Sequence, residues 1–296
     1  RTDSALARQR LAAHVWCARW FERAPASVAE VRAVLDAVLR GDATLPTAAL
    51  TARLTSARAA ADQHHFFHWP LEFADVFTPD RATGNTRAPG FDAVIGNPPW
   101  EMLRADHGEA SAATTRFLRG SGLYDASGRG HVNLYQPFVE RALDLTRPGG
   151  AIGLVLPWGI ASDDGSAALR ARLLDECRIT TWIGFDNAEA IFPVHRGLRF
   201  AAVVARTADR TDVLPMINGI TRASALDALC DADDVLVGAL PVPRAVVTPP
   251  GDKSRRIPDV RRAADLERLD TLTRRWPALG DPRGWAAQFG RELNAS

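Results

Sequence analysis

The stretch FDAVIGNPPW, residues 91–100, decides the fold that this chain is expected to adopt. Its apolar residues predict a buried strand, and they lead directly into Asn97, Pro98, Pro99 and Trp100. An Asn-Pro pair is enough to end a strand, because proline donates no backbone hydrogen bond. It does not account for the second proline or for the large aromatic ring. These four residues are therefore candidates for a functional site.

Strands and helices alternate after this stretch. The pattern predicts strands at residues 151–157, 179–185, 199–206 and 212–218, and helices at residues 133–150 and 166–177. Such alternation is typical of a mostly parallel, doubly wound α/β sheet. In such a sheet, ligands bind at the carboxyl ends of the strands, where Asn97 to Trp100 would lie.

The N-terminal part has a different pattern. Residues 1–63 predict a helical segment with three helices, the second of which begins at the capping-box pair Ser27 and Glu30. The aromatic stretch HHFFHWPLEF, residues 64–73, has a strand-like character. The chain therefore changes from helical to α/β organisation near residue 64.

Two further segments predict irregular structure. Residues 105–131 contain few large apolar groups and predict a long loop or lid. Its arginines could contact DNA phosphates or simply be solvated; they are Arg104, Arg116, Arg119 and Arg129. From residue 221 the alternation weakens, and TPPGDKSRRIPD, residues 248–259, predicts a linker.

Composition narrows the class of protein. The chain has 296 residues, of which 46% are hydrophobic and 24% charged, and its formal net charge is +1. These values indicate a globular protein and exclude a strongly basic nucleic-acid binder of the histone kind, although a local basic cleft is compatible with them. The cysteines and histidines show no metal-site or disulfide spacing, so no metal is expected. Without a membrane-spanning run or a secretory signal, we expect a cytoplasmic protein.

The residues after the first strand suit one kind of chemistry. The Asn97 side-chain oxygen and the Pro98 carbonyl can both accept hydrogen bonds from a single –NH2 group, and the two prolines stiffen the backbone between them. Trp100 adds a flat face on which an aromatic base can stack. An exocyclic amine of a flipped base matches these features, because two acceptors on its hydrogens favour release of the nitrogen lone pair.

At these residues the chain resembles a known family. Asn-Pro-Pro followed by an aromatic residue resembles the signature of amino-group methyltransferases that use S-adenosylmethionine. Residues 64–206 are similar to the large adenine-specific DNA methyltransferases of type IIG-like restriction–modification and phage-defence systems. The similar segments, in family order, are HHFFHWPLEFADVF, GFDAVIGNPPWE and NLYQPFVERALDLTRPGGAIGLVLP.

The resemblance implies an activity and a partner. The protein would transfer a methyl group from S-adenosylmethionine to the exocyclic amine of adenine in double-stranded DNA, with the adenine flipped out of the helix. Asn97 and Pro98 would bind the adenine amine, and Trp100, where tyrosine or phenylalanine is commoner, would stack on the base. Glu72 would accept a hydrogen bond from the cofactor's adenine. A second aromatic residue, Phe200 or alternatively Phe192, would pack against the target base.

One feature departs from the family. Residues 1–62 contain a single glycine, Gly41, and lack the Gly-rich turn that binds the methionine part of the cofactor. We therefore expect this turn upstream of Arg1 and a target-recognition domain downstream of Ser296, both in the same polypeptide. The isolated chain would then bind S-adenosylmethionine weakly or not at all, and the FDAVIG strand would be exposed where a neighbour should pair.

The complete interpretation is an α/β protein with a partial, doubly wound, Rossmann-like methyltransferase sheet. Its predicted parts are a helical segment at residues 1–63, a catalytic core at 64–220 and a mixed helical and linker segment at 221–296. Two alternatives stay open. One is an amino-methyltransferase that acts on a protein glutamine or on RNA, and the lid and the continuation beyond residue 220 favour DNA over it. The other is a non-catalytic DNA-binding remnant.

Overall fold

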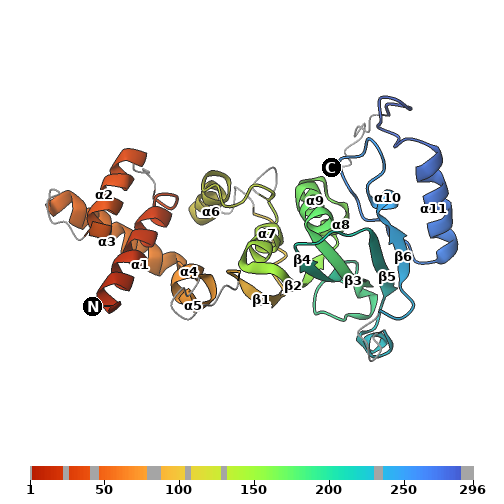
Figure 1. Ribbon diagram of the computed structural model, residues 1–296, viewed down its shortest axis with the longest axis horizontal. Coiled ribbons are helices and arrows are strands. Elements are labelled where there is room, and N and C mark those ends of the chain that lie inside the picture. Colours follow the sequence, from red (N-terminus) through yellow and green to blue (C-terminus); the bar gives the residue numbers. More distant parts are fainter. Residues whose placement is uncertain are drawn as a thin grey trace. The chain divides into compact units, whose positions relative to one another are not determined.

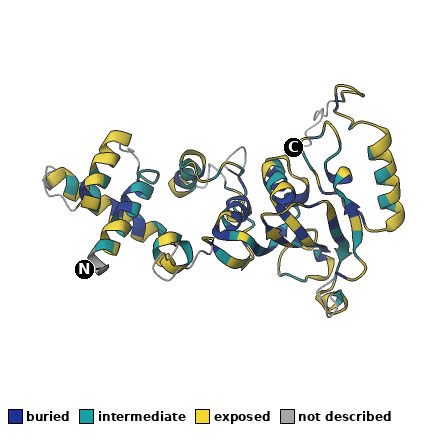
Figure 2. Cartoon of the chain, in the orientation of Figure 1, coloured by how far each residue is buried: buried dark blue, intermediate teal, exposed yellow. Residues whose placement is uncertain are grey.

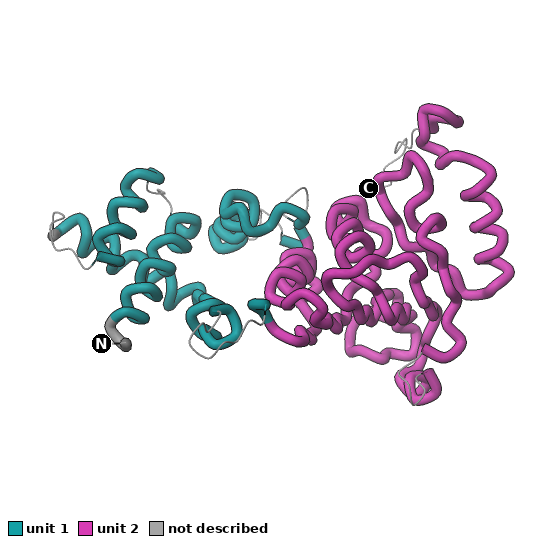
Figure 3. Tube along the Cα trace, in the orientation of Figure 1, with its two compact units in different colours: residues 1–90, 102–132 teal, residues 91–101, 133–296 magenta. Residues whose placement is uncertain are grey.

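The computed structural model describes residues 2–22, 27–40, 47–78, 88–103, 108–127, 132–229 and 236–287. The chain forms two compact units (Figure 3). The first comprises residues 1–90 and 102–132, and the second comprises residues 91–101 and 133–296. The predicted boundary after residue 63 therefore falls within the first unit, and the predicted boundary after residue 220 falls within the second.

Three helices begin the first unit, as the sequence predicts: α1 (Thr2–Ala18), α2 (Val28–Arg40) and α3 (Thr47–His64) (Figure 1). The capping box at the start of α2 is confirmed. The Glu30 amide donates to Ser27 Oγ at 3.2 Å, and the Ser27 amide donates to Glu30 Oε2 at 2.8 Å. The helices share a core of small and branched apolar residues. Its buried members are Val15, Ala18, Val31 and Ala57.

The aromatic stretch at residues 64–73 is not a strand, and the prediction was wrong here. The chain forms the short helix α4 (Trp69–Glu72) and then α5 (Ala74–Phe77). Pro70 lies in the first turn of α4. Proline suits this position, because its fixed φ is helical and its missing N–H would have no partner there.

The predicted loop or lid at residues 105–131 contains a helix, α6 (Glu109–Gly120). The prediction rested on the scarcity of large apolar residues in this segment. A helix needs few of them when alanine, the strongest helix former, fills its inner face. In α6 the buried residues are Ala113 and Leu118.

The arginines of this segment are only partly described. Arg104 and Arg129 lie outside the described residues. Arg116 Nε donates to the Trp20 carbonyl at 3.2 Å, and its guanidinium pairs with Glu109 at 2.9 Å. Arg116 therefore links α6 to Trp20, which lies just after α1. Contact of these arginines with DNA phosphates stays a prediction.

The second unit is built on a sheet with six strands among the described residues (Figure 1). The strands are β1 (Phe91–Gly96), β2 (Thr146–Pro157), β3 (Cys177–Asp186), β4 (Arg199–Thr207), β5 (Val213–Ile220) and β6 (Leu240–Pro243). In the sheet they follow the order β1-β2-β4-β3-β5-β6. The five strands that the sequence predicts from residue 91 onward are present, and the α/β class is confirmed.

The sheet is mixed, whereas the sequence predicted a mostly parallel one. β1 and β2 run parallel, as do β3 and β5, but β4 is antiparallel to both of its neighbours and β6 is antiparallel to β5. Parallel neighbours need a long crossover, usually a helix. Only the loop at residues 187–198 joins β3 to β4, so β4 returns beside β3 in the opposite direction.

Helices cover one face of this sheet. α7 (Tyr135–Leu145) packs against β2, α9 (Ala167–Asp175) packs against β3, and the short helix α8 (Gly159–Ser162) contacts β2. Alternate residues of β2 are buried, as expected for a strand with one covered face (Figure 2). The core between the sheet and these helices combines aliphatic side chains with the fully buried rings of Tyr135 and Trp182. Its buried side chains include Ile152, Leu154, Leu156, Leu169 and Leu173.

Strand β1 lies at the edge of the sheet, and among the described residues it pairs only with β2. Ile95 is 84% exposed although the sequence around it reads as a buried strand. β1 is thus an edge strand whose predicted burial is not observed, since none of its residues is buried; that a further strand should pair with it stays a prediction. An apolar edge with free backbone groups is a template for another strand.

The part of the chain after residue 220 contributes further elements to the second unit. β6 pairs with β5, and the short helix α10 (Arg244–Val247) buries Val246 and Val247. α11 (Ala263–Arg275) has no buried residue (Figure 2). None of the described helices has the length and apolar composition that crossing a bilayer requires.

The predicted linker at residues 248–259 packs on the rest of the second unit through hydrogen bonds and one buried side chain. The Arg170 guanidinium donates to the Ser254 carbonyl at 2.7 and 2.9 Å, and the Ile257 amide donates to the Ala161 carbonyl at 2.9 Å. The Ile257 side chain is buried. The prolines, glycine and charged residues of this segment predict an irregular backbone. They do not reveal that a backbone carbonyl of the segment accepts hydrogen bonds from a buried arginine.

Candidate active site

Four chain segments meet at one edge of the sheet in the second unit. β1, β2 and β3 run in the same direction, so their carboxyl ends share this edge, and the antiparallel strand β4 begins there. The pairing places Pro157 beside Phe200 and Asp186 beside Arg199. Asn97 to Trp100 follow β1 at this edge, where open α/β sheets bind ligands.

The four residues after β1 differ in their exposure. Asn97 and Pro99 are exposed, Pro98 is buried and Trp100 is half-buried. The Asn97 side chain makes no hydrogen bond with any residue that the structure describes. Since the two prolines have no N–H, the turn presents an amide oxygen and backbone carbonyls with few competing donors. It can therefore accept hydrogen bonds from a ligand's amine.

Trp100 rests on a cluster of phenylalanine rings. Its ring lies 6.0 Å from that of Phe192, at an interplanar angle of 90°, and 5.6 Å from that of Phe200, at 36°. Phe200 in turn stacks on Phe185, with 4.7 Å between centroids and 8° between planes. Edge-to-face and offset contacts of this kind favour defined ring orientations. Phe200 thus supports the Trp100 ring through a tilted contact, and Phe192 supports it through an edge-to-face contact.

Burial separates the two candidates for the second base-contacting aromatic residue. Phe200 is 2% exposed and lies between Phe185 and Trp100. Phe192 is half-buried, with its ring 4.9 Å from that of Phe200. A base can reach only an accessible ring, so the geometry favours Phe192 over Phe200. Contact of either ring with a base stays a prediction.

The loop between β3 and β4, residues 187–198, is held by Asn187, which the sequence did not single out. Asn187 is fully buried, and its Nδ2 donates to the Phe192 and Val194 carbonyls, both at 3.1 Å. Its Oδ1 accepts from the Phe192 amide at 3.0 Å. The only signal in the sequence was an asparagine two residues after the predicted strand at residues 179–185, and it does not reveal these contacts.

Paired charges lie at the same edge. Arg199 Nε donates to Asp186 Oδ1 at 2.7 Å, and the Arg199 guanidinium lies 3.9 Å above the Trp158 ring. Asp259 pairs with Arg199 at 3.0 Å, and Arg261 pairs with Asp186 at 2.9 Å. Each arginine thus meets two carboxylates, so this network adds little net charge to the edge. It fixes the start of β4 and the Trp158 ring that follows β2.

Glu72, the predicted cofactor contact, lies in α4 of the first unit. Its carboxylate pairs with Arg10 at 3.0 Å. Asn97 to Trp100 belong to the second unit. A contact between Glu72 and the cofactor stays a prediction, and such a contact would compete with Arg10.

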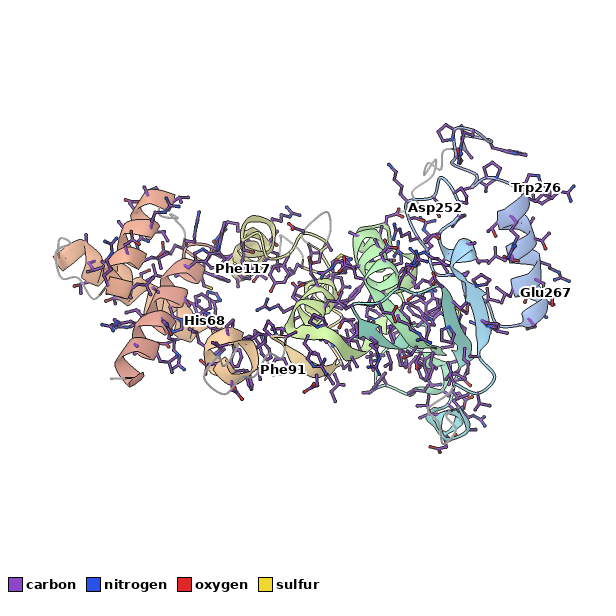
Figure 4. All side chains as sticks on the ribbon, viewed as in Figure 1. His68, Phe91, Phe117, Asp252, Glu267 and Trp276 are labelled. Atoms are coloured by element: carbon purple, nitrogen blue, oxygen red, sulfur yellow. The ribbon has the colours of Figure 1, made fainter. Side chains whose placement is uncertain are left out.

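A pair of histidines lies beside Glu72 in the first unit. His68 Nε2 and His14 Nδ1 are 2.9 Å apart, so one ring donates a hydrogen bond to the other. Figure 4 labels His68 among the helices of the first unit. Burial, together with the neighbouring His14, lowers the pKa of His68 to about 4. Burial is also the main cause of the lowered pKa of His14. The charged neighbours of the pair are Arg10, Arg58, Asp62 and Glu72.

The first unit should therefore lose stability in mild acid. Between about pH 6.5 and pH 4 the unfolded chain binds protons that the folded pair does not, so the free energy of unfolding falls as the pH is lowered. Thermal unfolding between pH 7.5 and pH 4.5 would measure this slope. His68→Asn should flatten it. His65→Asn is the matched control, because it removes an exposed imidazole and leaves the His14–His68 contact intact. An unchanged slope in His68→Asn would contradict the assignment.

Comparison with known proteins connects this site to a family. The profile of the Eco57I restriction-modification methylase family matches residues 28–192. The chain is 33% identical over 120 residues to the type II methyltransferase M.TthHB8I of Thermus thermophilus, covering 39% of this chain and 26% of that protein. It is 31% identical over 100 residues to the type II methyltransferase M.XhoI of Xanthomonas vasicola, covering 34% of this chain and 17% of that protein.

One similar solved structure is a type I restriction-modification system methyltransferase subunit from Streptococcus thermophilus, with a TM-score of 0.34 and 17% identity. The match covers 76% of this chain and 40% of that chain, and a likeness this distant supports no inference about function. The chain spans less than a third of either curated relative. The family profile, however, matches more than half of the 296 residues. The chain therefore belongs to the Eco57I restriction-modification methylase family.

Proposed function

We propose that the protein transfers a methyl group to the exocyclic amine of adenine in duplex DNA, as part of a restriction–modification or phage-defence protein. One observation carries this proposal. The Asn97 amide is exposed and unbonded among the described residues at the carboxyl end of β1, directly before Pro98 and close to the half-buried Trp100 ring. Membership of a restriction-modification methylase family supports DNA as the substrate.

The chain's own residues can bind and activate the amine. The Asn97 oxygen and the Pro98 carbonyl accept its two hydrogens, which disfavours delocalisation of the nitrogen lone pair into the ring. The same two acceptors stabilise the positive charge that develops on the nitrogen as it gains a methyl group. The Trp100 face holds the base in plane through stacking.

The cofactor is S-adenosylmethionine, as predicted and as family membership implies; when bound, it supplies an electrophilic methyl group. The residues at the β1 edge suit the methyl acceptor. The glycines of RPGGAIG lie within β2, away from this edge, and Gly150 is tightly enclosed: a Cβ there would lie 2.9 Å from the Asp92 carbonyl oxygen. They are therefore unsuited to a cofactor turn. We propose that the exposed side of β1 receives a further strand of the methyltransferase sheet, from a part of the polypeptide that carries this turn.

The alternatives differ in the acceptor. Protein-glutamine and RNA amino-methyltransferases would use the same acceptor pair on a different amine. The lid that favoured DNA over them contains helix α6, so that argument is weakened. Family membership replaces it, because the matched family is one of restriction-modification methylases. The exposed amide of Asn97, unbonded among the described residues, argues against a non-catalytic remnant.

Product analysis tests the proposed function. Duplex DNA, RNA and glutamine-containing peptides would each be incubated with an active preparation of the protein and isotopically labelled S-adenosylmethionine. Digestion and mass spectrometry of the nucleosides should show label in N6-methyladenine from DNA. Label in a cytosine, in RNA or in peptide would overturn the adenine assignment. No label in any acceptor, under conditions where the cofactor binds, would support the non-catalytic remnant.

Trp100→Ala should weaken extrusion of the target adenine, because stacking on an aromatic side chain contributes roughly 1–3 kcal/mol per base. Trp100→Phe should retain much of the activity, since a smaller platform remains. A fluorescent adenine analogue at the target position would measure extrusion in both variants. If the Ala variant extrudes the base as well as the parent does, Trp100 only packs against Phe192 and Phe200.

A further inference from the structure

We propose that Asn187 is a positioning residue for methyl transfer: its buried amide fixes the loop at residues 187–198 so that Phe192 stands edge-on against Trp100. This inference rests on the proposed function, because Trp100 matters only if a base stacks on it. Asn187 is 0% exposed, so it cannot touch the DNA itself. Its effect must pass through the loop.

The Asn187 side chain uses its hydrogen-bonding capacity on this loop. Nδ2 donates to the carbonyls of Phe192 and Val194 at 3.1 Å and reaches that of His195 at 3.4 Å. Oδ1 accepts from the Phe192 amide at 3.0 Å. Phe192 is thus held by both its N–H and its C=O, whereas other residues of the loop are held once by this amide. A buried, satisfied polar group of this kind specifies one conformation.

The ends of the loop are tied to the same residue. The Asn187 backbone amide donates to the Leu198 carbonyl at 3.1 Å, and the Ala190 amide donates to the Asn187 carbonyl at 2.9 Å. Ala190 has φ of 58°, in the left-handed region that costs energy for a residue with a side chain. Contacts centred on Asn187 therefore hold a turn that its sequence does not favour locally.

The loop places the Phe192 ring edge-to-face against the Trp100 ring. The two centroids are 6.0 Å apart and the planes are perpendicular. Phe192 also contacts Phe200, which lies under Trp100. If the loop relaxed, Phe200 would still support Trp100, but among the ring contacts of the described residues the edge-to-face contact with Phe192 would be lost. Misplacement of a reacting group by about 1 Å can lower a rate on the order of 10²-fold.

A double-mutant cycle separates this role from simple stability. In the parent, Asn187→Ala should lower the single-turnover rate on the order of 10–100-fold, with a smaller effect on DNA affinity. Combined with Phe192→Ala, it should cause little further loss, because its effect passes through Phe192. Asn187→Asp should resemble Asn187→Ala, since a carboxylate keeps the acceptor but loses the donor to the carbonyls.

Asn218 provides a matched control at the end of β5. Unlike the fully buried Asn187 it is half-buried, but its Nδ2 likewise donates to a backbone carbonyl, that of Val260 at 3.2 Å, and its hydrogen bonds do not involve the loop. Asn218→Ala should lower the melting temperature without coupling to Phe192. If Asn187→Ala and Phe192→Ala instead multiply their effects on the rate, as independent sites do, the positioning role is overturned.

Hydrogen exchange keeps this test independent of the proposed function. Peptides covering residues 187–198 should exchange faster in Asn187→Ala than in the parent, and peptides around Asn218 should not. Unchanged exchange in the loop would overturn the inference even in an active enzyme. If the parent methylates no adenine, the proposed function fails, whereas exchange still reveals whether Asn187 holds Phe192 in place.

Discussion

Asn97→Ala is expected to lower the single-turnover rate of methyl transfer on the order of 10²–10³-fold, with DNA affinity close to that of the parent. The reason is that the Asn97 oxygen acts on charge that develops only as the amine reacts. An interaction made mainly in the transition state appears in the rate and not in ground-state binding. Rapid quenching with enzyme in excess over labelled duplex DNA would measure the chemical step, in an active preparation of the protein.

Two variants sharpen this result. Asn97→Asp keeps an acceptor oxygen at the same reach, so it should retain more activity than Asn97→Ala. Asn218→Ala, in β5, removes an amide of the second unit that accepts nothing from a ligand in the proposed mechanism; because it bonds the Val260 carbonyl beside Asp259, it should lower the rate only slightly, and far less than Asn97→Ala does. A normal rate in Asn97→Ala would refute the proposed mechanism. An equal loss in Asn218→Ala would trace the effect to folding.

The elements predicted correctly are those with strong local patterns. Each of the five predicted strands is a largely apolar run, and four of them bury residues on at least one face, whereas β1 buries none; the capping box of α2 is a contact between residues three apart. Asn97 to Trp100 were found for a similar reason: a strand end followed by two prolines is visible in ten residues. Local sequence therefore predicted both the scaffold of the sheet and the acceptor part of the site.

The features missed depend on contacts between distant residues. The direction of β4 follows from a connection that lacks a helix, and an alternating pattern does not reveal this. Asn187 acquires its role only when the loop folds back on it. Phe192 and Phe200 could not be distinguished in sequence, because burial decides which ring is accessible. Glu72 pairs with Arg10, about sixty residues away along the chain, so its partner was not predictable either.

Arg170 links the core of the second unit to the segment that the sequence described as a linker. Its guanidinium is 0% exposed and donates to three backbone carbonyls: those of Ser254 at 2.7 and 2.9 Å, Asp163 at 2.8 Å and Ile160 at 3.1 Å. Burial lowers the pKa of Arg170, yet no carboxylate is bonded to it among these contacts. The carbonyl dipoles therefore stabilise the charge.

Arg170→Met should lower the free energy of unfolding of the second unit by about 3–5 kcal/mol. Methionine keeps an apolar stem, so the loss isolates the hydrogen bonds, whose carbonyls would be left unsatisfied. Arg256→Met is the matched control on the same segment, because the exposed Arg256–Asp164 pair should contribute at most about 1 kcal/mol. Denaturant unfolding would measure both variants. Equal losses would show that the Arg170 contacts are not structural determinants.

The same substitution should also affect the active-site edge, though less than Asn97→Ala. Residues 254–261 carry Asp259, which pairs with Arg199, and Arg199 lies over the Trp158 ring. If the segment loosens when Arg170 is replaced, Asp259 leaves Arg199 and the start of β4 loses one of its two carboxylate partners. Proteolysis near Ser254 should then become faster, and Asp259→Asn alone should reproduce the loss of activity without the loss of stability. Faster proteolysis with a normal rate of methyl transfer would show that the segment supports the fold and not the site.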